Sequence, residues 1–183
     1  FVFPAFSGGG AQRVAITLLS GLDRKIFNPE LIVFDESGPL RDTVPHDIPL
    51  HIIGKKRLRN AFPQLIKLLR SLNPDIVYST LSHVNLGLIL GKALLPHKTK
   101  LVIREANMPS ISLKSSPYPR LFMVLYRLLY SRADLVIATS KRMSSEFSEH
   151  FRVPKSKLTI LPNPVDVQKI RSQIECKQTI SGN

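Results

Sequence analysis

The chain has 183 residues, of which 43% are hydrophobic, and its formal net charge is +13 at pH 7. This length suits one α/β domain and hardly two, the hydrophobic fraction excludes a disordered chain, and a single cysteine, Cys176, excludes an internal disulfide. The charge indicates an anionic partner, no Cys/His cluster has the spacing of a zinc site, and no apolar run approaches the roughly 18–20 residues that span a bilayer.

The first predicted unit is a strand, a loop and a helix. The apolar run at 1–6 is followed by the glycine loop, which consists of Ser7, Gly8, Gly9 and Gly10. Apolar residues at helical spacing over 11–22 predict the helix, whose start offers unpaired N–H groups, and Arg13 adds a charged donor. We expect this loop and Arg13 to contact a phosphate or sugar, so that a β-branched residue at Gly9 would block the ligand and strain any positive φ. The alternative is a tight turn that only lets helix and strand pack closely.

A basic amphipathic segment follows two further strands, at 31–34 and 50–53. It has no acidic residue between Asp47 and Asp75, and it accumulates Lys55, Lys56, Arg57, Arg59, Lys67 and Arg70. Apolar residues at helical spacing over 62–72 predict a helix with one apolar stripe. In one interpretation this helix rests on anionic lipid; in the other its stripe packs on the sheet and its charges are solvated.

Strands and helices alternate along the rest of the chain. Strands are expected at 75–79, 100–103, 134–138 and 157–161, helices at 84–95, 119–130 and 139–150, and a long loop at 108–117. The alternation predicts an α/β fold with a doubly wound, Rossmann-like parallel sheet covered on both faces. Because ligands bind beyond the carboxyl ends of such strands, one rim should gather the glycine loop, Ser82, His83, residues 104–107 and Ser140.

Several of these rim residues have two interpretations. His83 either binds acceptor hydroxyls or caps its helix. Arg104 and Glu105 either contact a ligand or form an ion pair that holds the loop. Ser140 is either an N-cap or a ligand contact. The helix at 119–130 is apolar over most of its circumference, which suits a membrane boundary or the interface with a second domain.

Five segments together resemble one family in their order and spacing over nearly the whole chain. They are Gly8 to Val14, Asp75 to Ser79 with His83, Arg104 to Asn107, Ala133 to Ser140, and Leu161 to Asp166. In these segments the chain resembles the N-terminal half of retaining glycosyltransferases with the two-domain GT-B fold, similar to glycosyltransferase family 4. That group includes bacterial capsule, lipopolysaccharide and glycolipid sugar transferases.

The resemblance implies transfer of a sugar from a nucleotide diphosphate sugar, with retention at the anomeric carbon and without a metal or other cofactor. It implies that residues 1–166 bind the acceptor, a glycan or a lipid-linked sugar, while 167–183 form the crossover to a donor-binding C-terminal domain that the chain lacks. We expect such a half to transfer no sugar alone. The resemblance also implies polysaccharide biosynthesis in the cytoplasm, peripheral at an anionic inner membrane face, with no nucleic acid as partner.

Residue by residue, the resemblance places donor and acceptor contacts at Gly8, Gly9, Gly10, Arg13, His83, Arg104, Ser140 and Asn163. Many members have a histidine against the donor sugar after the fifth strand, where this chain has Ala106. We expect either Glu105 or Asn107 to take over part of that contact, which makes both of them candidate catalytic residues. Two other functions stay open. One is a basic Rossmann-like binding module for nucleic acid, which the 7% aromatic content and the lack of a recognition motif disfavour. The other is a natural one-domain subunit of a split glycosyltransferase.

Overall fold

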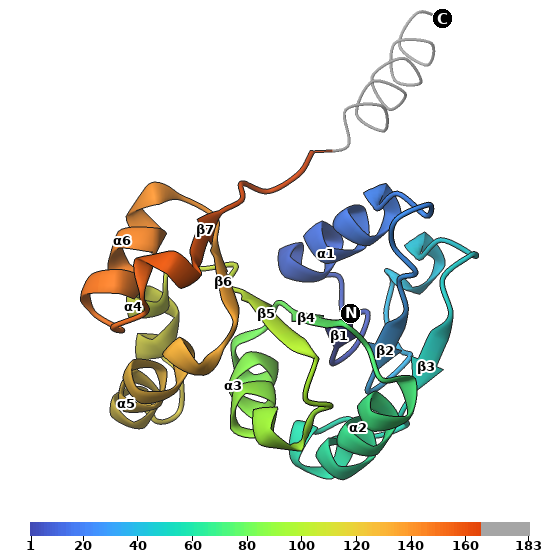
Figure 1. Ribbon diagram of the computed structural model, residues 1–183, viewed down its shortest axis with the longest axis horizontal. Coiled ribbons are helices and arrows are strands. Elements are labelled where there is room, and N and C mark those ends of the chain that lie inside the picture. Colours follow the sequence, from blue (N-terminus) through green and yellow to red (C-terminus); the bar gives the residue numbers. More distant parts are fainter. Residues whose placement is uncertain (166–183) are drawn as a thin grey trace, which may run out of the picture.

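The computed structural model describes residues 1–165, which form one seven-stranded sheet. Its strands are β1 (Val2–Phe3), β2 (Leu31–Val33), β3 (Leu50–Ile52), β4 (Ile76–Ser79), β5 (Lys100–Arg104), β6 (Leu135–Ala138) and β7 (Leu158–Ile160). They lie in the order β3-β2-β1-β4-β5-β6-β7, and every neighbouring pair is parallel (Figure 1). The chain starts in the middle of the sheet, winds to one edge and returns to build the other, which confirms the doubly wound α/β fold.

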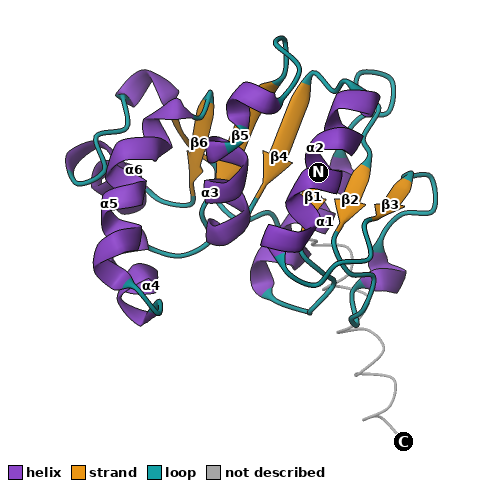
Figure 2. Ribbon diagram, turned by 90° about the horizontal axis from the view of Figure 1, so that it is seen from below, coloured by secondary structure: helices purple, strands orange, loops and turns teal. Residues whose placement is uncertain are grey.

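Helices on both faces connect these strands. The α-helices of the described residues are α1 (Gly10–Gly21), α2 (Leu58–Leu72), α3 (Ser82–Leu90), α4 (Pro109–Ser112), α5 (Pro119–Leu129) and α6 (Lys141–Glu149). Two 3-10 turns extend them, η3 (Leu113–Ser115) after α4 and η4 (Tyr130–Arg132) after α5. Helix α1 lies on one face of the sheet and α2 and α3 on the other (Figure 1), and the view from below shows α2 and α3 in front of the strands (Figure 2).

The sheet separates two hydrophobic cores, because successive side chains of a strand point to opposite faces. On one face Val77 and Val136 pack with residues of α2, α3, α5 and α6. On the other face Phe3 and Val33 pack with Leu19 of α1. Removing this apolar surface from water is the main driving force that holds the helices against the strands.

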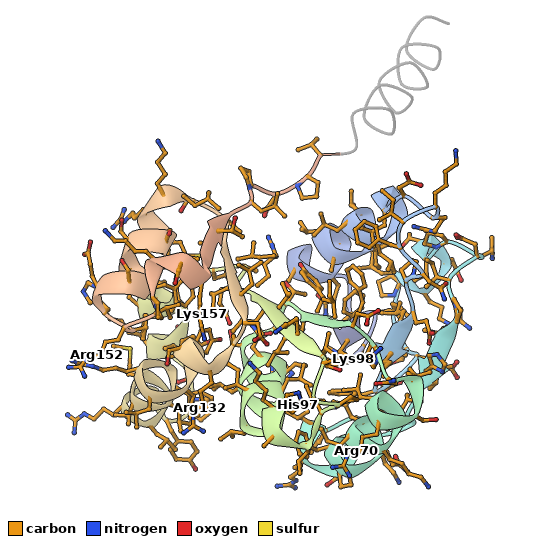
Figure 3. All side chains as sticks on the ribbon, in the orientation of Figure 1. Arg70, His97, Lys98, Arg132, Arg152 and Lys157 are labelled. Carbon is orange, nitrogen blue, oxygen red and sulfur yellow. The ribbon has the colours of Figure 1, made fainter. Side chains whose placement is uncertain are left out.

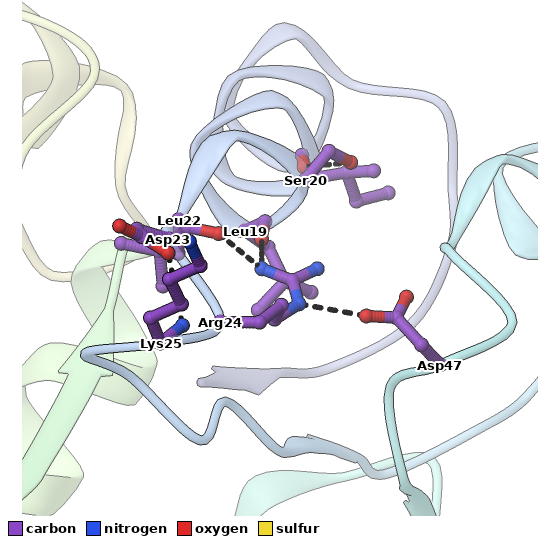
Figure 4. A network of polar contacts seen from close by, with 8 residues as sticks. Leu19, Ser20, Leu22, Asp23, Arg24, Lys25 and Asp47 are labelled. Carbon is purple, nitrogen blue, oxygen red and sulfur yellow. Dashed lines mark hydrogen bonds and ion pairs between the residues drawn. The ribbon is translucent and has the colours of Figure 1, made fainter.

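Arg24 fixes the end of α1 that is far from the glycine loop. Its Nη1 donates to the carbonyl oxygens of Leu19 at 3.0 Å and Leu22 at 2.7 Å, and its Nε donates to the Asp47 carboxylate at 2.7 Å (Figure 4). The last carbonyls of a helix lack partners within the helix, so a cation is favourable there. Because Asp47 lies just before β3, the contact also ties α1 to the segment that leads into this strand.

The observed elements differ from the predicted ones chiefly at 108–117. There α4 and η3 replace the expected loop, and Pro109 opens α4 at a position where its missing N–H costs no hydrogen bond. The helix predicted at 84–95 begins at Ser82 and ends at Leu90. The predicted crossover at 167–183, its boundary at 166 and Cys176 lie outside the described residues.

Candidate functional site

The carboxyl ends of the strands meet at one edge of the sheet, because all neighbouring strands are parallel. The glycine loop follows β1, Thr80 follows β4, Arg104 ends β5, Ser140 follows β6 and Asn163 lies beyond β7. The fold therefore brings to one rim the segments that the sequence predicted there, although they are far apart along the chain.

The glycine loop turns directly into the first turn of α1. Gly9 is the N-cap residue with an extended backbone, φ −67° and ψ 154°, and Gly10 is the first helical residue. The left-handed conformation lies at Gly8, with φ +80°. The strain predicted for a side chain at Gly9 therefore belongs to Gly8, whereas close approach of a ligand to Gly9 stays a prediction. Arg13 bends back over the loop, and its Nε donates to the Gly8 carbonyl at 3.4 Å.

Two residues that the sequence did not single out support this loop. The buried Gln12 donates from Nε2 to the Ser7 hydroxyl at 2.8 Å. Gly38 has φ +130°, and a Cβ at this position would lie 2.1 Å from the carbonyl oxygen of Phe6. The Phe6 N–H donates to the Ser37 carbonyl at 3.1 Å, so the two segments are bound backbone to backbone. No local pattern reveals such a contact, because it joins two different connections of the sheet.

Arg104 is buried at the end of β5, with 1% of its surface exposed. Its Nη1 donates to the Thr80 hydroxyl at 3.0 Å, and its Nη2 donates to the side-chain oxygen of Asn163. Within residues 1–165, the ion pairs of the structure do not include Arg104, so the pairing predicted with Glu105 is wrong. The reason is that adjacent residues of a strand point to opposite faces.

The Glu105 carboxylate is enclosed on the other face, with 2% of the residue exposed. It accepts hydrogen bonds from Ser82 Oγ at 2.9 Å, Asn85 Nδ2 at 2.7 Å, Tyr126 OH at 3.1 Å and Tyr130 OH. Burial raises the pKa of Glu105, and these hydrogen bonds oppose the rise. The placement contradicts the catalytic contact predicted for Glu105, because the carboxylate is surrounded by donors of the protein and does not face the rim.

An open pocket of about 440 Å³ lies between the β5–α4 and β6–α6 connections. Its polar lining consists of Asn107, Ser112, Ser115, Thr139 and Ser140, and its apolar lining of Ala106, Met108, Ile111 and Met143. None of these lining residues carries a charge. Amide and hydroxyl groups beside apolar side chains are the surface that a neutral sugar ring requires.

Two of the predicted site residues, Asn107 and Ser140, meet in this pocket. Asn107 is exposed there, as a ligand contact requires. The Ser140 hydroxyl accepts a hydrogen bond from the Met143 N–H at 3.2 Å, which confirms the N-cap interpretation. Because a hydroxyl can accept and donate at once, this bond does not exclude a ligand.

His83 lies at the exposed start of α3, outside the residues that line this pocket. Desolvation by surrounding atoms lowers its pKa, which favours a neutral ring. Among the described residues, no side chain caps the start of α3, so the predicted capping role of His83 is wrong. Its role as an acceptor contact stays a prediction.

A second cavity, of about 490 Å³, lies at the opposite end of the strands. Apolar side chains dominate its lining, including Phe1, Ile26, Leu69 and Ile76. It shares no residue with the rim, and its composition does not suit a phosphate or a sugar. Separately, none of the helices within 1–165 combines the length and apolar character needed to cross a bilayer.

Comparison with known proteins places this rim in a family. The model of Glycosyltransferase Family 4 matches residues 8–169, from the glycine loop to beyond Asn163. The chain belongs to glycosyltransferase family 4. This membership confirms the family that the five sequence segments resemble, and it covers all ten predicted site residues.

Similar proteins extend this picture and are longer than the chain. An N-acetylgalactosamine-N,N'-diacetylbacillosaminyl-diphospho-undecaprenol 4-alpha-N-acetylgalactosaminyltransferase of Campylobacter jejuni is 28% identical in an alignment of 181 positions, which covers 91% of this chain and 47% of that protein. An uncharacterized glycosyltransferase of Methanocaldococcus jannaschii is 26% identical over 59% of this chain and 28% of its own length. The chain therefore spans about half or less of these family relatives.

Solved structures share the fold. HepE of Anabaena, crystallised in complex with UDP-glucose, superposes with a TM-score of 0.66 at 16% identity, over 96% of this chain and 49% of HepE. At this identity the likeness concerns the fold alone. The seven-stranded sheet therefore corresponds to about half of a larger structure.

Proposed function

We propose that this chain is the acceptor-binding half of a retaining glycosyltransferase, which moves a sugar from a nucleotide diphosphate sugar to a lipid-linked or glycan acceptor. The observation that carries the proposal is the family match over residues 8–169, which includes every segment at the carboxyl ends of the strands. The uncharged pocket of Asn107 and Ser140 lies at this edge, where ligands of open α/β sheets bind.

The acceptor side of the proposal rests on this pocket and on its surroundings. Asn107 and Ser140 would bind hydroxyl groups of an acceptor sugar, with the carbon face of the ring against Met108 and Ile111. His83 would contribute a further contact. The name of the Campylobacter relative describes a diphospho-undecaprenol acceptor, which supports an acceptor linked to a lipid by a diphosphate.

The donor side involves the glycine loop. Backbone N–H groups of Gly9 and Gly10 at the start of α1, together with Arg13, would contact the donor diphosphate or sugar, while a second domain would hold most of the nucleotide. The UDP-glucose bound to HepE supports a nucleotide sugar as donor. We propose no metal ion and no further cofactor for the transfer.

The lipid-linked acceptor implies a membrane surface. Helix α5 exposes apolar side chains, and the basic segment 55–70 presents exposed Lys67 and Arg70 on α2. Apolar groups beside cations suit a peripheral site on anionic lipid at the cytoplasmic face. Family membership favours this sugar-transferase proposal over the basic nucleic-acid module, and the split one-domain subunit stays open as an alternative.

The full-length protein tests the proposal. It should release nucleoside diphosphate and extend a lipid-linked sugar acceptor when it is incubated with a panel of nucleotide diphosphate sugars. Gly9→Val should abolish this transfer, because a side chain there blocks close approach of the donor. It should also lower the melting temperature somewhat, because its Cβ would lie 2.5 Å from Oε1 of the buried Gln12, which must shift. Transfer at the wild-type rate by a stable Gly9→Val protein would remove the glycine loop from the donor site. Failure of the wild-type protein with every donor and acceptor pair would overturn the function itself.

A further inference from the structure

The surroundings of Glu105 assign it a different task from the catalytic one. Its four donors come from two helices, Ser82 and Asn85 from α3, Tyr126 from α5 and Tyr130 from the turn η4 that follows. Asn85 and Tyr130 are completely buried, so these donors have no access to water. A buried donor that loses its acceptor destabilises the folded state, so the carboxylate is difficult to displace.

The orientation of the network is fixed by a further layer of contacts. The Ser79 hydroxyl donates to Asn85 Oδ1, and Asn85 Nδ2 donates to the Arg104 carbonyl at 3.0 Å as well as to Glu105. The rings of Tyr126 and Tyr130 stack with centroids 3.9 Å apart. Asn85, Tyr126 and Tyr130 are therefore each held in place by a neighbour, and the carboxylate position is determined from several directions.

The residues that directly follow Glu105 belong to the rim pocket. Ala106, Asn107 and Met108 come next in the chain and form one wall of the uncharged pocket. The Glu105 N–H donates to the Ile137 carbonyl at 3.2 Å, so its backbone is bound to β6 while its side chain is bound to α3 and α5. Glu105 directly precedes this wall, and both its backbone and its side chain are held by hydrogen bonds.

We propose that Glu105 is a positioning residue, which anchors the 106–108 wall of the acceptor pocket to α3 and α5. This inference rests on the proposed function for the identity of the ligand, and on the contacts of Glu105 for the anchor itself. Glu105 touches no reacting atom in this role. Glu105 instead keeps Asn107 in a fixed position. If Asn107 shifts, the acceptor that it contacts is misplaced relative to the donor, and the rate of transfer falls.

The two oxygens of the carboxylate permit a matched pair of variants. Oε1 accepts from Asn85, Tyr126 and Tyr130, whereas Oε2 accepts only from Ser82. In Glu105→Gln the amide oxygen can take the place of Oε1, and the amide nitrogen can donate to the Ser82 hydroxyl, which rotates to accept. Glu105→Leu has a similar size but leaves three buried donors without an acceptor.

The experiment compares both variants with the wild type in the full-length protein. Glu105→Gln should retain most of the transfer activity, and Glu105→Leu should lose about ten- to a hundredfold in kcat/KM for the acceptor, with the donor KM unchanged. A residue that only stabilises the fold would lower the active fraction and leave the acceptor KM as it is. Loss of activity in Glu105→Gln as large as in Glu105→Leu, or an unchanged acceptor KM in Glu105→Leu, would overturn the anchor.

Amide hydrogen exchange tests the anchor without any substrate. Residues 106–112 should exchange at the wild-type rate in Glu105→Gln and faster in Glu105→Leu. If Glu105→Leu does not fold, the double variant Tyr126→Phe with Tyr130→Phe takes its place, since it removes two donors and keeps both rings. Equal exchange of this segment in all variants contradicts the anchor even if the wild type proves to transfer no sugar, which separates this inference from the proposed function.

Discussion

At the scale of single residues, two buried charged groups lie next to each other at the end of β5 and are held by neutral partners. Arg104 donates to Thr80 and Asn163 on one face, and Glu105 accepts from hydroxyl and amide groups on the other. Each hydrogen bond to a charged group contributes about 1.5–3 kcal/mol to the stability of the folded state. Removing one partner leaves the other buried group without a hydrogen bond. Each side chain thereby ties β5 to two other elements of the domain.

Gly38 gives a residue-scale prediction for stability. Gly38→Ala should lower the free energy of unfolding by about 2–5 kcal/mol, because φ +130° is closed to side chains and the Cβ would overlap the Phe6 carbonyl. The matched control is Gly21→Ala, where a Cβ meets nothing within 4 Å. Urea denaturation of both variants measures the difference. An equal midpoint for the two would show that the contact between Gly38 and Phe6 is absent in solution.

The pH dependence of stability gives a second prediction, on Glu105. Burial raises the pKa of Glu105 above its ordinary value of 4.5, so the folded state binds the proton more tightly than the unfolded state. The stabilising contribution of the protonated group is then complete below pH 4.5 and is lost as pH rises through the folded pKa. Urea denaturation at several pH values measures the free energy of unfolding of the wild type and of Glu105→Gln. The wild-type value minus the variant value should fall with rising pH.

Asp134 is the control, because its pKa is shifted in the opposite direction from that of Glu105. Burial alone would raise its pKa, but hydrogen bonds from Lys92 Nζ and from the Leu101 N–H lower it overall. A lowered pKa contributes stability that is present above the unfolded pKa and is lost as pH falls through the folded pKa. The stability of wild type minus that of Asp134→Asn should therefore grow with rising pH. A Glu105→Gln difference that also grows would contradict the raised pKa of Glu105.

At the scale of elements, α5 is the unusual helix, because it is apolar on two faces. Its inner face packs Tyr126 and Leu129 into the core. Its outer face exposes Leu121, Val124 and Leu128, at 54%, 52% and 64% of their surfaces. A helix with one buried stripe needs no such outer face, so a partner surface explains it better than packing within this domain.

Vesicle binding tests the outer face of α5. The triple variant Leu121→Ser, Val124→Ser, Leu128→Ser should bind phosphatidylglycerol-containing vesicles about tenfold more weakly than the wild type, because it loses the apolar surface that would enter the lipid. Ile26→Ser, which changes a side chain that is 73% exposed in the α1–β2 connection, is the control and should bind normally. Flotation of vesicles measures the bound fraction.

The lipid composition and the salt concentration show whether the basic residues contribute to vesicle binding. Binding should be weaker on pure phosphatidylcholine vesicles and should decrease with salt, since the basic residues contribute attraction that ions screen. Equal binding of the triple variant and the wild type would exclude α5 as the contact, and equal binding to neutral and anionic vesicles would exclude the basic segment.

At the scale of the whole molecule, the chain carries a net charge of +13, and most of its Lys and Arg side chains within residues 1–165 are exposed. Arg70, Arg132 and Arg152 lie in different parts of the domain in Figure 3, and all three are exposed. The rim pocket, by contrast, is uncharged. The charge therefore suits long-range attraction to an anionic surface, while the choice of ligand depends on neutral groups at the rim.

Transfer activity gives the prediction at this scale. The purified chain of 183 residues should show no turnover with any nucleotide sugar, because it spans only about half of the proteins it matches and catalysis requires a donor held against the acceptor. The full-length protein under the same conditions is the control. Chromatographic detection of product with the 183-residue chain alone would mean that this half holds both substrates, or that it is a complete one-domain enzyme.

The amino-acid sequence by itself determined the order and type of the elements. Alternating apolar runs and amphipathic segments predict the strands and helices, and parallel strands must end at one edge, so the rim segments were foreseeable. The short helix α4 was not, since Pro109 and the serines of 108–117 are equally typical of a loop. The family was also readable, because its segments are continuous stretches of sequence.

Only the tertiary structure decided which side chains of these segments line the rim pocket. Glu105 and Asn107 are two positions apart, yet the first is enclosed by Tyr126 and Tyr130 and the second lines the pocket. The donors that enclose Glu105 lie 20 to 25 residues away in the sequence, and the backbone that excludes a side chain at Gly38 belongs to another loop. Such contacts depend on packing between distant segments, which local propensity and periodicity do not encode.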